Sequence, residues 1–140
     1  MEIPQLTPTD AHDVLQRNPA AIYLDVRTEA EFEAGHPAGA RNVPIVFFDP
    51  ATRQPKLNPD FLATVRRHLP PATKLVIGCQ SGGRSQRACE ILADAGYTDV
   101  ANVSGGFGGA REHGVRGWRD LGLPVENGSP PGRSHADLKK

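Results

Sequence analysis

A thiol, two glycines and an arginine lie close together in residues 79–85. Gly82 and Gly83 tolerate backbone angles that other residues resist, so successive amide N–H groups there can point inward as an anion nest, and Arg84 adds a fixed positive charge. Because these groups favour a thiolate, the nucleophilic form of cysteine, we expect Cys79 to be the catalytic residue. The same donors would hold the anionic group of a substrate. The residues expected to bind it are Gln80, Ser81, Gly82, Gly83, Arg84 and Ser85.

The sequence around Cys79 places it where a strand ends and a helix begins. Residues 74–78 are an apolar run expected to form the strand, and Ser85 is the expected N-cap of the helix that follows. In a parallel sheet, ligands bind at this junction, where the unpaired N–H groups and the dipole of the helix attract anions. No lysine follows the glycines, which excludes a Walker-type phosphate-binding loop.

Short apolar runs alternate with helical periods along residues 1–125, which is typical of a single α/β domain with a mostly parallel sheet. The expected strands are residues 21–26, 41–45, 74–78 and 100–103. Of these, residues 41–45 should lie near an edge, because Pro44 cannot donate to a ladder. The expected helices start at Thr7, Thr28, Asn58 and Ser85, with a last short helix after Trp118. Residues 126–140 are polar and rich in proline and glycine, so we expect a disordered tail.

Composition excludes several classes of function. The 140 residues include sixteen basic and sixteen acidic side chains, so no overall field favours nucleic acid or an acidic membrane. No apolar run approaches the roughly 18 residues of a membrane-spanning helix, and no signal peptide is visible. Two cysteines do not make a disulfide framework, so a cytoplasmic location is expected. Cys79 and Cys89 should stay unpaired, because the helix turns their side chains differently.

Four motifs, in register along residues 5–124, resemble those of the rhodanese (thiosulfate sulfurtransferase) superfamily. The first is Cys-x-x-Gly-x-Arg-Ser at Cys79. The others are Asp25-Val26-Arg27 followed by Glu31-Phe32, residues 35–44, which are similar to the family's Gly-His-Ile-Pro-Gly-Ala-x-Asn-Ile-Pro, and residues 96–106 followed by Trp118. The resemblance implies a rhodanese-like α/β fold, with a mostly parallel five-stranded sheet flanked by helices on both faces.

The resemblance also implies that the protein is a sulfurtransferase. Cys79 would take the outer sulfur of thiosulfate or a related donor as a persulfide and pass it to cyanide, a thiol or a partner protein. The amides of residues 80–85 would stabilise the persulfide, and Arg84 would bind the anionic donor and the leaving sulfite. No metal or organic cofactor is needed.

Two alternatives stay open. The protein can be a persulfide carrier that delivers sulfur to a biosynthetic partner, with little activity toward free thiosulfate. It can also be a small cysteine phosphatase or arsenate reductase, whose loops in this superfamily are one residue longer. The spacing Cys-x4-Arg from Cys79 to Arg84 favours sulfur transfer.

Several residues near the predicted site carry a second interpretation. Asp25 and Arg27 either orient the loop or bind substrate, or they form an ion pair that fixes a turn. His36 is expected to be a hydrogen-bonded turn residue, because a thiolate that is already formed needs no general base. Cys89 is expected to be a small buried residue.

A glycine-rich stretch, residues 107–117, is longer than in compact family members and includes Arg111 and His113. It is either a lid or partner-docking loop, or a flexible surface insertion. Arg87 either extends the positive rim of the site or pairs with a carboxylate on its own helix. Residues 45–48 are expected to be core or pocket wall.

Overall fold

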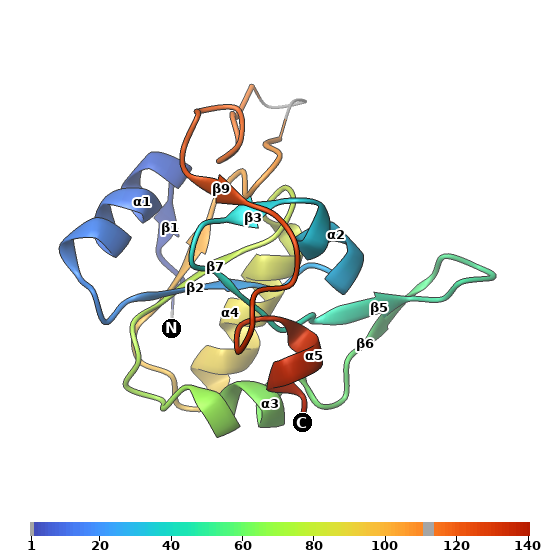
Figure 1. Ribbon diagram of the computed structural model, residues 1–140. Coiled ribbons are helices and arrows are strands. Elements are labelled where there is room, and N and C mark those ends of the chain that lie inside the picture. The colour runs from blue at the N-terminus through green and yellow to red at the C-terminus, as the bar shows by residue number, and fades with distance from the viewer. Residues whose placement is uncertain (1, 111–113) are drawn as a thin grey trace.

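The computed structural model describes residues 2–110 and 114–140, and Figure 1 labels its elements. A five-stranded sheet lies at the centre, in the order β1-β8-β7-β2-β4, with every neighbouring pair parallel. The strands are β1 (Gln5–Leu6), β2 (Ile22–Asp25), β4 (Arg41–Asn42), β7 (Leu75–Gly78) and β8 (Val100–Val103). The predicted α/β class is confirmed, and β4 lies at an edge of the sheet, as expected.

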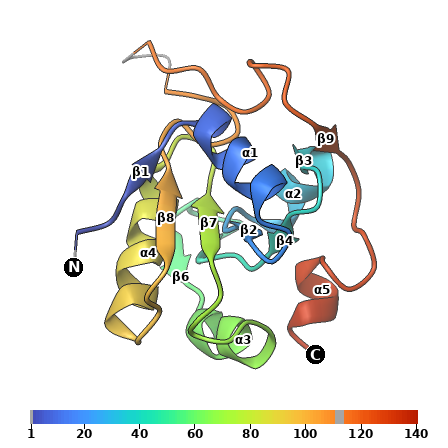
Figure 2. The ribbon, with the colours of Figure 1, turned by 90° about the vertical axis from the view of Figure 1, so that its left-hand side faces the viewer.

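Helices cover both faces of this sheet (Figure 2). Side chains alternate along a strand, so Leu24 and Ile77 face one side while Tyr23 and Val76 face the other. The first side packs against α3 (Phe61–His68) and α4 (Gly83–Asp94), and the second against α1 (Pro8–Arg17) and α2 (Glu29–Ala34). No described helix is long and apolar enough to cross a membrane.

Local hydrogen bonds set where the helices begin. Thr7 caps α1, and Thr28 and Glu31 form the reciprocal capping box that starts α2. Helix α3 begins at Phe61, later than the predicted start at Asn58. The Asn58 side chain is buried and donates to a main-chain carbonyl at 2.9 Å, so it forms part of the turn before the helix.

Two antiparallel pairs lie outside the main sheet. β3 (His36–Pro37) pairs with β9 (Val125–Glu126), and β5 (Val46–Phe48) pairs with β6 (Pro55–Leu57). The β5–β6 pair is a hairpin that projects from the body of the molecule (Figure 1). Residues 45–48 are therefore divided between two environments, since Ile45 enters the core whereas Phe48 is 45% exposed on the hairpin.

The structure places residues 126–140, for which the sequence predicts a disordered tail, against the body of the molecule. Helix α5 (His135–Leu138) buries Leu138 in the same apolar cluster that α3 contributes to. The Asn42 N–H donates to the Arg133 carbonyl at 2.8 Å, and the buried His135 ring lies 2.5 Å from a Glu29 oxygen. The partners of these few groups lie far away in the sequence, so composition carries no information about the contacts.

The start of the glycine-rich stretch lies against the residues that follow β7. The Phe107 N–H donates to the Cys79 carbonyl at 2.8 Å, and the Gly108 N–H donates to the Gln80 carbonyl at 2.9 Å. Gly106 has a φ of 55°, and a Cβ there would lie 2.3 Å from the Cys79 carbonyl oxygen. Only glycine permits this approach, so this part of the stretch fixes the loop after β7.

The rest of the stretch returns toward the body. Ala110 and Val115 form an isolated antiparallel bridge, while Arg111 and His113, which the sequence places in the predicted lid or insertion, lie outside the described residues. The chain then makes turns at Trp118 in place of the predicted short helix. The buried Trp118 indole anchors these turns by donating to a main-chain carbonyl at 2.7 Å.

Leu138→Ala should lower the free energy of unfolding by about 2 kcal/mol, the low end of the range for a buried leucine, because the residue lies near the chain end. Urea denaturation followed by tryptophan fluorescence measures the change. Lys139→Ala is the matched control, because its side chain is exposed and should not affect the midpoint. Equal midpoints for the two variants would show that the tail does not pack in solution.

Gly106→Ala should destabilise the protein by about 3 kcal/mol, because a collision with the Cys79 carbonyl adds to the strain of a positive φ. Gly122→Ala is the control with the same kind of backbone. Gly122 has a φ of 72°, but nothing lies within 4 Å of its Cβ position, so about 1 kcal/mol is expected. Urea denaturation measures the free energy of unfolding of both variants. A decrease for Gly106→Ala no larger than that for Gly122→Ala would exclude a tight contact at Gly106.

Candidate active site

Cys79 follows directly after β7, at the carboxyl edge of the sheet, as the sequence predicts. The residue is only 2% exposed. Its sulfur accepts the Gly82 N–H at 3.1 Å, and Ser85 Oγ lies 3.4 Å from it. The loop therefore folds back over its own cysteine, and the Gly82 N–H stabilises a negative charge on the sulfur.

The backbone of this loop presents hydrogen-bond donors that have no partner. Within residues 2–110 and 114–140, no acceptor is found for the N–H groups of Gln80, Ser81, Gly83, Arg84 and Ser85. The last three belong to the first turn of α4, where N–H groups have no partner inside the helix. Together with the positive end of the helix dipole, these donors make the loop suited to bind an anion.

Gly82, and not Ser85, is the residue that precedes α4. Its φ of 114° is accessible to glycine and strained for other residues, and the helix starts at Gly83, whose φ is not positive. The conformational freedom of glycine is thus used at Gly82 alone. The predicted capping role of Ser85 is wrong, because Ser85 lies inside the first turn and its Oγ donates to Asn102 Oδ1 at 2.5 Å.

Asn102 supports the loop, although the sequence analysis did not assign it a role. It lies on β8 and is 3% exposed. Its Nδ2 donates to Gln5 Oε1 at 2.9 Å and to the Gly82 carbonyl at 3.3 Å. Asn102 thereby joins the loop to two strands of the sheet. The available signal was an amide residue within an otherwise apolar strand.

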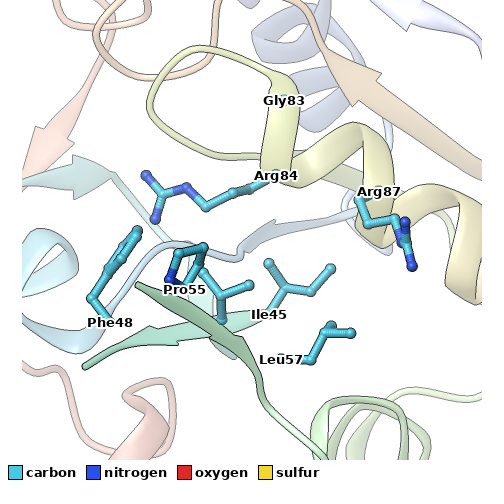
Figure 3. A pocket seen from close by; sticks show the side chains of 8 residues that line it. Ile45, Phe48, Pro55, Leu57, Gly83, Arg84 and Arg87 are labelled. Carbon is cyan, nitrogen blue, oxygen red and sulfur yellow. The ribbon is translucent and has the colours of Figure 1, made fainter. Parts of the chain in front are cut away.

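Arg84 does not direct a free charge at the loop. Its guanidinium pairs with both oxygens of Glu31, at 2.7 and 2.9 Å, and extends toward the Phe48 ring (Figure 3). Burial acts to raise the pKa of Glu31, but hydrogen bonds from Arg84 and Thr28 outweigh it and lower the pKa to about 2. Glu31 is therefore ionised at neutral pH and balances the Arg84 charge. Sequence analysis did not find this pairing, because the two residues lie on different helices.

Asp25 and Arg27 form a buried ion pair next to the loop, with 2.8 Å between Arg27 Nη2 and Asp25 Oδ2. Arg27 also donates to the Gly35 carbonyl at 2.6 Å and to Gln80 Oε1 at 3.3 Å. Both charges are thus satisfied within the protein. Of the two interpretations of this pair, the geometry supports an ion pair that fixes a turn and also orients the Gln80 side chain.

His36 and Cys89 have structural environments. The His36 ring stacks on Phe32 with 3.6 Å between centroids, and its Nδ1 lies 2.6 Å from the Phe32 carbonyl oxygen, as expected for a turn residue. Cys89 is fully buried, and burial raises its pKa to about 12, so it stays a neutral thiol. Cys79 and Cys89 are both free, which leaves Cys79 available for chemistry.

Comparisons with known proteins agree with this arrangement. The Rhodanese-like domain family matches residues 7–113. Thiosulfate sulfurtransferase 16, chloroplastic, of Arabidopsis thaliana is 41% identical over 118 residues, which cover 84% of this chain and 88% of the relative. Thiosulfate sulfurtransferase 18 of the same plant is 45% identical over 105 residues, 74% of this chain and 70% of the relative.

Solved structures show the same fold. The crystal structure of Rv0390 from M. tuberculosis superposes with a TM-score of 0.75 at 33% identity, covering 91% of this chain and 100% of that one. The family match spans most of the chain and includes the strand, loop and helix that position Cys79. The chain therefore belongs to the rhodanese-like sulfurtransferase family.

Proposed function

We propose that the protein moves sulfane sulfur from thiosulfate or a related donor to a nucleophilic acceptor through a persulfide on Cys79. The observation that carries this proposal is the Gly82 N–H at 3.1 Å from the Cys79 sulfur, within a loop whose other amides have no described acceptor. Such preorganised donors stabilise negative charge on sulfur before and after sulfur uptake. A persulfide anion places its charge where these donors converge.

In the first step, the Cys79 thiolate attacks the outer sulfur of thiosulfate. A new S–S bond forms to the Cys79 sulfur, the S–S bond of thiosulfate breaks, and its electron pair leaves with sulfite. The products are a Cys79 persulfide anion and sulfite, so the total charge does not change. No proton has to move, which explains why the site needs no histidine next to Cys79.

In the second step, the acceptor attacks the outer sulfur of the persulfide. Cyanide forms thiocyanate, and the electron pair of the broken S–S bond returns to the Cys79 sulfur as a thiolate. The loop donors face a negatively charged sulfur both in the Cys79 thiolate and in the Cys79 persulfide. They therefore do not have to rearrange between the two steps.

In the proposed mechanism, Arg84 helps to bind the thiosulfate donor. Thiosulfate is a dianion, and its sulfonate oxygens would compete with the Glu31 carboxylate for the Arg84 guanidinium. The amides then provide most of the attraction, and Arg84 adds one charge-assisted contact. The names of the two Arabidopsis relatives support thiosulfate as the donor.

A persulfide carrier would use the same first step and differ in the second, because only its protein partner would remove the sulfur quickly. A phosphatase or arsenate reductase would need room for a tetrahedral oxyanion. The spacing Cys-x4-Arg between Cys79 and Arg84 makes the narrower loop, which supports the sulfur chemistry.

Incubation of the reduced protein with thiosulfate should add one sulfur atom to its mass, and a reductant should remove it. Cys79→Ser should abolish the gain, because the attacking sulfur is lost. Cys89→Ala should keep it, because that thiol is fully buried. Intact-protein mass spectrometry measures all three proteins, and the absence of a gain in fully reduced wild-type protein would refute thiosulfate as donor.

Cyanide added to the loaded protein separates the alternatives. Rapid, repeated thiocyanate formation is expected for an enzyme, whereas a carrier would release its sulfur slowly and show little turnover. Hydrolysis of p-nitrophenyl phosphate or reduction of arsenate, without sulfur uptake, would instead favour the oxyanion chemistry.

Arg84→Ala should raise the KM for thiosulfate about tenfold, the equivalent of one charge-assisted hydrogen bond of about 1.5 kcal/mol. Glu31→Gln should lower this KM by about threefold, because it removes the carboxylate that competes with the donor for Arg84. Initial rates of thiocyanate formation at varied thiosulfate give both values.

Arg17→Ala is the control for this pair, because Arg17 is an exposed arginine on α1, on the opposite face of the sheet from α4. It should leave the KM unchanged. A KM that is the same in Arg84→Ala and in Arg17→Ala would show that the donor does not contact Arg84.

A further inference from the structure

A groove of about 580 Å³ lies between the β5–β6 hairpin and the first turns of α4 (Figure 3). This volume is within the range of about 300–1,000 Å³ that is usual for small-molecule sites. Ile45, a core residue, lines it between the hairpin and the helix. Of the residues that line it, the steps described for Cys79 use only Gly83 and Arg84, at one end of the groove.

The hairpin turns an apolar face toward the groove because of strand alternation. Val46 pairs with Leu57 and Phe48 with Pro55, so these four side chains share one face of the two strands. All four line the groove. Leu57 is 54% exposed, so the hairpin holds apolar surface in water where a ligand would cover it.

The helix side of the groove is cationic. Arg84 and Arg87 both line it, but the Arg84 charge is balanced by Glu31. Arg87 makes no ion pair with any residue of the described ranges, and Glu90, one candidate partner on the same helix, accepts from Gln86 instead. The groove therefore combines an apolar wall with one positive charge that no described carboxylate balances.

One end of the groove reaches the loop that carries the reactive sulfur. Gly83 lines the groove, and the preceding residue, Gly82, donates its N–H to the Cys79 sulfur at 3.1 Å. Arg87 lies one helical turn further on, about 6 Å along the axis of α4. A ligand in the groove can therefore reach toward the sulfur with one end and toward Arg87 with the other.

We propose that this groove binds the sulfur acceptor, and that the acceptor is a small organic thiol with an apolar chain and an anionic group at the far end. The chain would lie on the Val46–Leu57 face, and the anion would pair with Arg87. This inference rests on the proposed function and names the acceptor class that the persulfide serves. The size of the groove and its single unbalanced charge favour this occupant.

The transfer step balances with no further reactant. The thiolate of the acceptor attacks the outer sulfur of the Cys79 persulfide, and a new S–S bond forms to the acceptor. The S–S bond of the Cys79 persulfide breaks, and its electron pair stays on the Cys79 sulfur, which becomes a thiolate. The acceptor leaves as an organic persulfide, and the charge is conserved.

Three acceptors test the proposal with thiosulfate as donor: 6-mercaptohexanoate, 6-mercaptohexanol and cyanide. The first two are matched thiols that differ only in the carboxylate or hydroxyl at the far end. Sulfite formation reports turnover with all of them. Leu57→Ser should raise the KM for both thiols about tenfold relative to the KM for cyanide, because it removes apolar contact. Arg87→Gln should raise the KM for 6-mercaptohexanoate about threefold relative to the KM for 6-mercaptohexanol, because only the first carries a carboxylate at the far end.

Phe47→Ser and Arg17→Gln are the matched controls. Phe47 lies on the opposite face of the same hairpin and is 40% exposed, and Arg17 lies on α1. Both should leave the ratios unchanged. Suppose that the protein takes up sulfur and forms thiocyanate, but neither Leu57→Ser nor Arg87→Gln alters its ratio of KM values. This result would overturn the inference about the groove and leave the proposed function intact. Failure of thiosulfate to load Cys79 would overturn the proposed function and this inference with it.

Discussion

The loop that carries Cys79 depends on the close approach of a second backbone. Phe107 and Gly108 donate to the carbonyls of Cys79 and Gln80, and this is possible only because Gly106 has no side chain. The carbonyls at the start of the loop are therefore satisfied from outside. The Gly82 N–H donates to the Cys79 sulfur, and the other N–H groups of the loop face no described acceptor and stay available to a ligand. This difference between the paired carbonyls and the unpaired N–H groups follows from backbone geometry and needs no particular side chain along the loop.

The two arginines next to the Cys79 loop are each paired with a carboxylate. Arg27 is held by Asp25 and Arg84 by Glu31, so neither guanidinium attracts anions at long range. The chain as a whole carries no net charge. Attraction for an anion at the loop then comes from the amides and the helix start, which act over short distances. Such a site selects by fit at contact more than by electrostatic steering.

The sequence predicted the site where local patterns decide the structure. An apolar run followed by Cys79 and two glycines identified the strand, the loop and the helix, and the α/β order of the domain followed from the same periodicities. The helix start was missed because serine is the commoner cap, and only the backbone of Gly82 shows that Ser85 is inside the helix. The pairing of Arg84 with Glu31 joins residues 53 positions apart, on helices that cover opposite faces of the sheet. Single-residue propensities carry no information about such a contact.

The tail that follows β9 has a consequence for the solution behaviour of the protein. β4 is the last strand of the sheet, and an unpaired outer strand offers N–H and C=O groups on which another chain can add a strand and start aggregation. The Arg133 carbonyl accepts the Asn42 N–H of this strand at 2.8 Å, and α5 packs close by. The tail thereby closes the open edge of the sheet. Arg133 Nη1 also donates to the Ala40 carbonyl next to this strand at 3.3 Å, so the edge is covered by residues about 90 positions away in the sequence.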